Sequence, residues 1–131
     1  MNPHDLRFSP THEWVHVDNA NGEVIATVGI SAFAVQQLTD LVYIELPQVG
    51  RPVAVGEPIG EIESVKAVSD LYSPVTGDIV EVNSALVDAL ETFSSDPYGG
   101  GWIAKIRVTD MKSLEPLMDH AAYEKQCAAE G

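Results

Sequence analysis

Cysteine, basic side chains and long apolar runs are all scarce in this chain of 131 residues, and each scarcity excludes a class of protein. The single cysteine, Cys127, cannot form a disulfide within the chain, which favours a reducing compartment. No apolar stretch approaches the roughly 20 residues of a membrane span, and residues 1–10 lack the apolar core of a secretory signal. We therefore expect no membrane association.

Positive charge is the scarcest property of all. Seven Lys and Arg stand against 20 Asp and Glu, for a net charge of −13. Such a chain repels phosphate backbones and anionic lipid surfaces, which excludes nucleic-acid binding as a function. Apolar residues make up 45% of the sequence, and the length fits one domain over residues 1–131 with a real core. Between Arg7 and Lys105 the only lysine is Lys66.

Short apolar segments separated by Gly, Pro and Asn predict a mostly β protein, a sandwich or barrel rather than a parallel α/β sheet. Two helices interrupt this pattern. Ser31 can cap a short helix over residues 31–38, and residues 113–127 carry apolar side chains at helical spacing. We expect this C-terminal helix to pack on the β body.

Three patterns resemble catalytic or ligand-binding motifs, but the secondary structure expected around each one explains it better. Residues 12–16 read His-Glu-Trp-Val-His, but a strand would place the two histidines about 13 Å apart, too far to share one zinc ion. The glycines at 99–101 lead into a strand, whereas a phosphate loop leads into a helix. Glu61 and Glu63 share one face of a strand, where a solvated acidic surface is the default. The sequence thus predicts no catalytic residues and no metal site.

Lys66 leaves two interpretations open. It is either a solvated lysine on a strand or a lysine presented at a hairpin tip for covalent modification. Pattern alone does not decide, because the tip would lack the Gly or Asn that favours a tight turn.

The residues around Lys66 resemble a known signature. Glu63-Ser64-Val65-Lys66-Ala67, followed by Ser69-Asp70 and Ser73-Pro74-x-x-Gly77, is similar to the lipoyl-attachment site of the glycine cleavage H-protein family. The resemblance continues, in family order, at residues 12–14, 28–30, 41–50, 96–102 and the terminal helix. It implies a flattened β-sandwich of the lipoyl/biotinyl-carrier type. Lys66 lacks the flanking methionines of biotin carriers, which points to lipoate.

The resemblance implies a non-catalytic lipoyl carrier whose lipoic acid is joined by an amide to Lys66. Its partners would be a pyridoxal-phosphate glycine decarboxylase, a tetrahydrofolate-dependent aminomethyltransferase and the FAD enzyme dihydrolipoyl dehydrogenase. The carrier would pass the aminomethyl group and reducing equivalents among them. A lipoate ligase or lipoyl transferase would load it, recognising Glu63, Ser64, Val65 and Ala67 around the tip.

The resemblance also implies an acidic cleft that shelters the aminomethyl-lipoyl arm, lined here by Thr11, Glu13 and Asp70. The alternative is an H-like relay protein that takes no part in glycine turnover and instead hands lipoate to other enzymes or serves a redox response. We expect a bacterial cytoplasmic location, because the N-terminus does not resemble a transit peptide. A mature mitochondrial chain would look the same.

Overall fold

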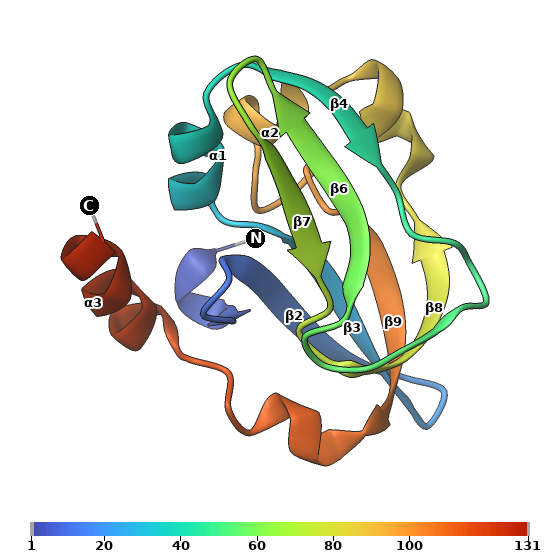
Figure 1. Ribbon diagram of the computed structural model, residues 1–131. Coiled ribbons are helices and arrows are strands. Elements are labelled where there is room, and N and C mark those ends of the chain that lie inside the picture. Colours follow the sequence, from blue (N-terminus) through green and yellow to red (C-terminus); the bar gives the residue numbers. More distant parts are fainter. Residues whose placement is uncertain (1, 131) are drawn as a thin grey trace.

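Two β-sheets packed face to face form the body of the molecule (Figure 1). The computed structural model describes residues 2–130. One sheet has six strands in the order β1-β2-β3-β9-β8-β5, and the other has three in the order β4-β6-β7, with every neighbouring pair antiparallel. The strands are β1 Arg7–Phe8, β2 Glu13–Ala20, β3 Glu23–Ile30, β4 Leu41–Glu45, β5 Pro52–Val53, β6 Pro58–Ser64, β7 Val68–Tyr72, β8 Thr76–Val82 and β9 Ala104–Asp110. The sheet order confirms the predicted mostly β sandwich.

Helices lie at the margins of the two sheets. They are η1 Pro3–Asp5, α1 Ala32–Leu38, η2 Ser84–Asp88, α2 Thr92–Ser95, η3 Met111–Leu114 and α3 His120–Glu130. The short predicted helix is confirmed as α1, and the Ser31 side chain accepts the Ala34 amide hydrogen as its N-cap. None of the helices in residues 2–130 has the length and apolarity needed to cross a membrane.

The expected bounds of the C-terminal helix, residues 113–127, are wrong. Ser113 belongs to a 3-10 helix that ends at Leu114, and α3 begins only at His120. Pro116 has no amide hydrogen to continue a helix, and Met118 pairs with Phe8 as an isolated β-bridge. The Asp119 side chain then accepts the Ala122 amide hydrogen and starts the helix anew.

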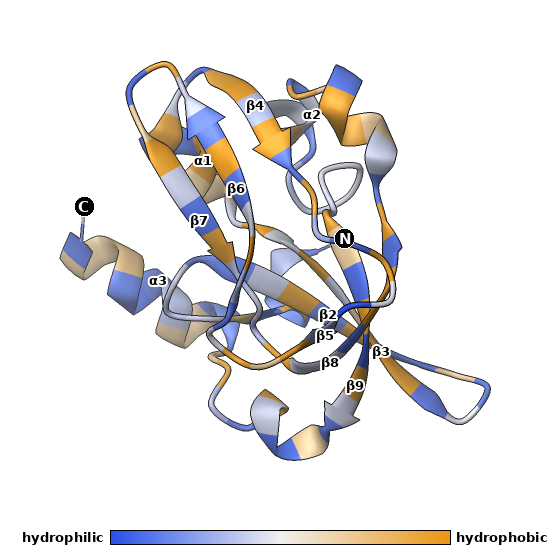
Figure 2. Cartoon of the chain, turned by 45° about the vertical axis from the view of Figure 1, so that its right-hand side comes forward, coloured by the Kyte–Doolittle hydropathy of each residue, from blue (hydrophilic) through white to orange (hydrophobic). Residues whose placement is uncertain are grey.

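The core divides into two clusters of buried side chains. The larger lies between the sheets. Figure 2 shows hydrophobic and hydrophilic residues following one another along the strands, the pattern by which a strand turns one face to a core. The smaller is aromatic and lies under α3, and it contains Leu6, Phe8, Trp14 and Tyr123. Trp14 requires glycine at position 29, because a Cβ there would lie 2.5 Å from the indole ring.

Candidate functional site

Lys66 lies at the tip of the hairpin that joins β6 to β7, rather than within a strand. The Lys66 side chain is exposed. Ion pairs among residues 2–130 use other basic side chains, and none involves Lys66. The amine is therefore accessible from solvent and is not neutralised by a neighbouring carboxylate.

A buried serine replaces the glycine that a tight hairpin turn would normally use. The Ser64 Oγ accepts hydrogen bonds from the amides of Lys66, at 3.3 Å, and Ala67, at 3.1 Å. The Ser64 amide in turn donates to the Ala67 carbonyl at 2.8 Å, and the Val65 amide donates to the Asp40 carbonyl at 3.0 Å. The tip backbone is thus fixed on both sides of the lysine.

The other residues predicted around the tip differ in exposure. The side chains of Val65 and Ala67 face solvent, Glu63 is half-buried, and Ser64 is 5% exposed. Glu63 on β6 lies opposite Val68 on β7 and opposite Tyr43 on β4. A partner enzyme would meet Val65 and Ala67 first, whereas Ser64 acts from beneath through the backbone.

A cleft of about 290 Å³ opens beside β7, between the segment that precedes β2 and helix α1. It brings together the three residues predicted to line it, Thr11, Glu13 and Asp70. Apolar side chains form much of the remaining wall: Ile30, Phe33, Ala34, Leu38, Ile62 and Leu71. Since β7 runs directly from the hairpin tip to this wall, Ser69 in the cleft is only about 10 Å of extended chain from Lys66.

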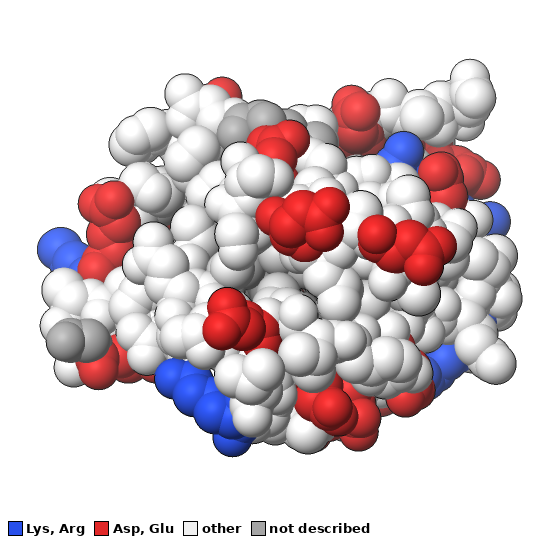
Figure 3. All heavy atoms as spheres, turned by 90° about the horizontal axis from the view of Figure 1, so that it is seen from above, with Lys and Arg blue, Asp and Glu red and all other residues white. Residues whose placement is uncertain are grey.

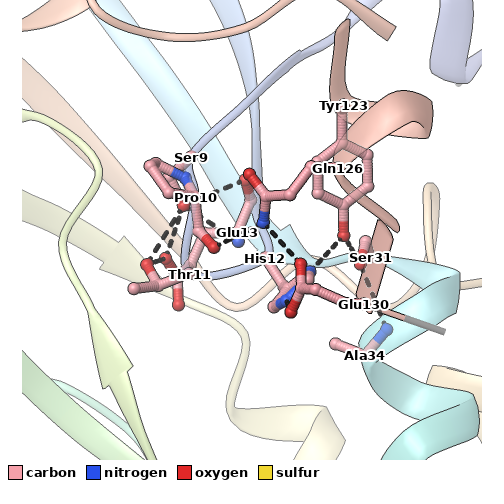
Figure 4. A network of polar contacts seen from close by, with 10 residues as sticks. All are labelled: Ser9, Pro10, Thr11, His12, Glu13, Ser31, Ala34, Tyr123, Gln126 and Glu130. Carbon is pink, nitrogen blue, oxygen red and sulfur yellow. Dashed lines mark hydrogen bonds and ion pairs between the residues drawn. The ribbon is translucent and has the colours of Figure 1, made fainter. Parts of the chain in front are cut away.

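Glu13 is a buried carboxylate, 2% exposed, held by hydroxyl groups and one amide. The Ser9 hydroxyl donates to Glu13 Oε1 at 2.7 Å, and the Thr11 hydroxyl donates to the same oxygen (Figure 4). The amide of Tyr72, on the free edge of β7, donates to Oε2 at 3.4 Å. Burial raises the pKa of the Glu13 carboxyl, and these hydrogen bonds oppose the rise. No ion pair among residues 2–130 involves this carboxylate.

Asp70 occupies a different environment at the same cleft. It is exposed on β7 and accepts a 3.4 Å hydrogen bond from the Tyr72 hydroxyl. The cleft therefore has one sheltered carboxylate, Glu13, and two exposed ones, Asp70 and Glu130. Within residues 2–130, no three His, Cys, Asp or Glu side chains are grouped to hold a metal ion.

Sequence reasoning missed two residues of this site, Ser9 and His12. Ser9 is buried and bonds Glu13 through both its hydroxyl and its amide. His12 lines the cleft, and its ring contacts α3, more than a hundred residues away in the chain. No short-range pattern in the sequence links His12 to that helix, so only the fold reveals the contact.

Acidic groups dominate the face of the molecule seen from above. Figure 3 shows carboxylates spread across this face, with the basic side chains mostly at its periphery. On the outer side of the small sheet, Glu45, Glu61 and Asp70 lie directly opposite one another on β4, β6 and β7. The surface around the hairpin therefore attracts basic rather than acidic proteins.

Comparisons with known proteins agree with this geometry. Residues 6–130 match the model of a protein family described as glycine cleavage H-protein. The glycine cleavage system H protein of Rhodopirellula baltica is 54% identical over 130 residues, which cover 98% of this chain and 97% of that protein. The one of Phenylobacterium zucineum is 52% identical over 119 residues, 91% and 95% of the two chains. A crystal structure of the H protein from Mycobacterium marinum superposes with a TM-score of 0.84 at 40% identity, over 95% of this chain and 98% of that one.

Proposed function

Because the chain belongs to the glycine cleavage H-protein family, we propose that it carries lipoic acid as an amide on Lys66 and performs no catalysis itself. The observation that carries this proposal is the position of Lys66, exposed at the tip of a hairpin whose backbone is fixed by Ser64. An enzyme can reach such an amine from outside, and the rigid strands define where an attached arm begins.

Attachment requires the lysine nitrogen to become a nucleophile. A ligase or transferase removes a proton from the ammonium, the nitrogen attacks the activated carboxyl carbon of lipoate, and the activating group leaves as the amide forms. Ser64 holds the tip backbone during this reaction, while Glu63, Val65 and Ala67 offer the loading enzyme its contacts beside the lysine.

The cleft suits an arm of this chemistry. The lipoyl group supplies a disulfide that accepts an aminomethyl group and two electrons, and its hydrocarbon chain is apolar. Phe33, Leu38 and Ile62 offer apolar contacts along the wall, and Glu13 lies among them as a carboxylate. We assign Glu13, supported by Thr11 and Asp70, to the binding of the cationic amine of the cargo. A cation beside Glu13 stabilises the ionised carboxylate, which burial otherwise disfavours.

The carrier would visit three enzymes in turn: a pyridoxal-phosphate glycine decarboxylase, a tetrahydrofolate-dependent aminomethyltransferase and the FAD-containing dihydrolipoyl dehydrogenase. The acidic surface around the hairpin supports docking to basic faces on these partners. Association with each should weaken as ionic strength rises, because salt screens charges at such interfaces.

Intact mass is the measurement that tests lipoylation. The wild-type chain is expressed with a lipoate ligase and lipoate, beside Lys66→Arg and, as a matched control, Lys105→Arg. We expect a lipoyl-sized increment in the wild type and the control, and a bare mass in Lys66→Arg. An unmodified wild type would refute the proposal. Exchange of radiolabelled bicarbonate with glycine, in the presence of the decarboxylase, then tests the glycine-specific role, and its absence would favour a lipoate relay.

Retention of the cargo tests the cleft. The loaded arm should lose its aminomethyl group to water faster in Glu13→Ala and in Asp70→Asn than in the wild type. Glu61→Gln, which changes an exposed carboxylate on β6 outside the cleft, is the control. An unchanged decay in both cleft variants would refute the assignment of Glu13 and Asp70.

A further inference from the structure

Helix α3 packs on the molecule chiefly through Tyr123, with Cys127 and the His120 ring in lesser contact with the same aromatic cluster. Tyr123 is its single buried residue, and its ring stacks on Phe8 at 4.4 Å between centroids, with the two planes nearly parallel. A helix of 11 residues with one buried side chain gains little from apolar burial. Polar contacts therefore contribute to its orientation as well.

Three of those polar contacts reach the segment that immediately precedes Glu13. Tyr123, Gln126 and Glu130 are spaced by three and four residues, so they share one face of α3. The Tyr123 hydroxyl lies 2.6 Å from His12 Nδ1, and Glu130 Oε1 lies 3.1 Å from His12 Nε2. The Gln126 amide donates to the Pro10 carbonyl at 2.8 Å (Figure 4). The helix thus holds one short segment at three places.

Tyr123 also contacts Ser31, the residue that caps the first turn of α1. Ser31 Oγ accepts the Ala34 amide hydrogen at 3.2 Å and lies 2.5 Å from the Tyr123 hydroxyl. All donors are used if Ser31 donates to Tyr123, Tyr123 donates to His12 Nδ1, and His12 Nε2–H donates to Glu130. This chain of hydrogen bonds, from Ala34 through Ser31, Tyr123 and His12 to Glu130, is called the α1–α3 chain below.

The α1–α3 chain links two parts of the cleft wall, the segment that contains His12 and the first turn of α1. His12 precedes Glu13, and its backbone adopts a left-handed φ of 76°. Its imidazole stacks on Phe33 of α1 at 5.2 Å, and both side chains line the cleft, as does Glu130. The Ser31 amide also donates to the His12 carbonyl at 2.9 Å. His12 therefore touches the carboxylate segment, the apolar wall and α3 at once.

We propose that His12 and Tyr123 are positioning residues of the cleft, which hold Glu13 and the α1 wall at the separation that shelters the loaded arm. This inference rests on the proposed function, in which the arm and its cationic cargo occupy the cleft. It assigns to α3 a role in cargo retention, although α3 supplies no group that contacts the hairpin lysine in the contacts described for residues 2–130.

Tyr123→Phe is the sharpest variant, because it removes the hydroxyl and keeps the ring that stacks on Phe8. In the lipoylated, loaded protein we expect the half-life of the aminomethyl group to fall about fivefold, the factor that corresponds to one hydrogen bond. In the same variant the Ala34 amide should exchange with solvent faster, while the Lys112 amide, capped by Asp110 elsewhere, should not change. Tyr43→Phe, an exposed tyrosine on β4, is the matched control.

A second pair of variants separates positioning from general destabilisation. Glu130→Gln keeps an oxygen that accepts from His12 Nε2, so retention should remain near the wild type. Glu130→Ala removes that acceptor and should shorten the half-life while the urea midpoint of unfolding stays within error, because Glu130 is largely exposed. Glu124→Ala on the same helix, which pairs only with His120, is the control.

The outcomes are distinguishable from those of the proposed function. A shorter half-life in Glu13→Ala with an unchanged half-life in Tyr123→Phe and Glu130→Ala would overturn this inference alone. Unchanged half-lives in all of these variants would overturn both. Faster Ala34 exchange with full cargo retention in Tyr123→Phe would also refute the inference, because the α1–α3 chain would then be broken without effect on the cleft.

Discussion

The lysine hairpin and the cleft are built in opposite ways, although one strand, β7, serves both. The hairpin tip is local, since Ser64 and the backbone of residues 64–67 fix it, with support from the Asp40 carbonyl and the neighbouring strand β4. The cleft combines residues from the start, the middle and the end of the chain, and its carboxylate, Glu13, is buried.

This difference matches two physical demands. A lysine that several enzymes must reach has to stand clear of the body, and short-range hydrogen bonds suffice to present it. A site that keeps water from a reactive cation has to be enclosed, and enclosure requires walls from several elements. Because different side chains fix the hairpin tip and the buried carboxylate, most substitutions should affect one region and spare the other.

The largest expected effect comes from Tyr123→Ala, which removes a buried ring from the aromatic cluster under α3. The free energy of unfolding should fall by about 3 kcal/mol or more, measured by urea denaturation. At temperatures where the variant is folded, the rate of lipoylation at Lys66 should equal that of the wild type. A slower lipoylation of the folded variant would show that the hairpin depends on α3 and would break the comparison.

Glu13→Gln should change how stability depends on pH. Burial raises the pKa of Glu13 above its ordinary value of 4.5, so the folded state binds this proton more tightly than the unfolded state. The free energy of unfolding of the wild type therefore decreases as pH rises from about 4.5 through the folded pKa. The total decrease is about 1.4 kcal/mol for each unit by which folding raises the pKa.

The stability of Glu13→Gln relative to the wild type should accordingly increase with pH over that range, in urea titrations from pH 4 to pH 8. Glu61→Gln, an exposed carboxylate outside the cleft, provides the control series. A relative stability of Glu13→Gln that is independent of pH would contradict the burial of an uncompensated carboxylate.

Ser64→Ala should act on the hairpin and spare the cleft. It removes the acceptor of two amide hydrogens at the tip, and we expect a cost of about 1.5 kcal/mol in unfolding free energy. Lipoylation should slow, because the lysine backbone is no longer fixed, while the half-life of the loaded cargo stays unchanged. Unaltered lipoylation kinetics would mean that the turn needs no side-chain support.

The smallest expected effect is a gain in stability from substitution of Thr39, which lies between helix α1 of the cleft wall and Asp40 beside the hairpin tip. Thr39 ends α1 with φ 65° and ψ −125°, a conformation that glycine adopts without strain, and the next carbonyl accepts the Val65 amide. Thr39→Gly should therefore stabilise the protein by about 1 kcal/mol, seen as a higher Tm. A loss of stability, or an altered lipoylation rate, would show that the strained joint supports the hairpin.

Local chemistry made part of this molecule predictable. Ser31 before an apolar run identified α1, and the alternation of short strands and turns identified the sandwich. The predicted start of the C-terminal helix, residue 113, is seven residues too early. The apolar spacing around Pro116 suits a helix, but Met118 forms a β-bridge with Phe8 instead.

The cleft was predictable only through family resemblance. Thr11, Glu13 and Asp70 do line one cleft, but the burial of Glu13 depends on Ser9 and on the edge of β7, which no periodicity reveals. His12 is 118 residues from Glu130 in the chain, a separation beyond any local pattern. The hairpin was ambiguous for a different reason: a serine side chain replaces the expected turn glycine.

The long separation in sequence between His12 and the α3 residues that contact it also has a consequence during synthesis. On a translating ribosome, the hairpin can form once residue 72 has left the exit tunnel, since its bonds lie between β6 and β7 and to Asp40. The α1–α3 chain has to wait for residues 123–130. On a nascent chain Lys66 thus emerges well before α3, the helix that contributes Glu130 to the cleft.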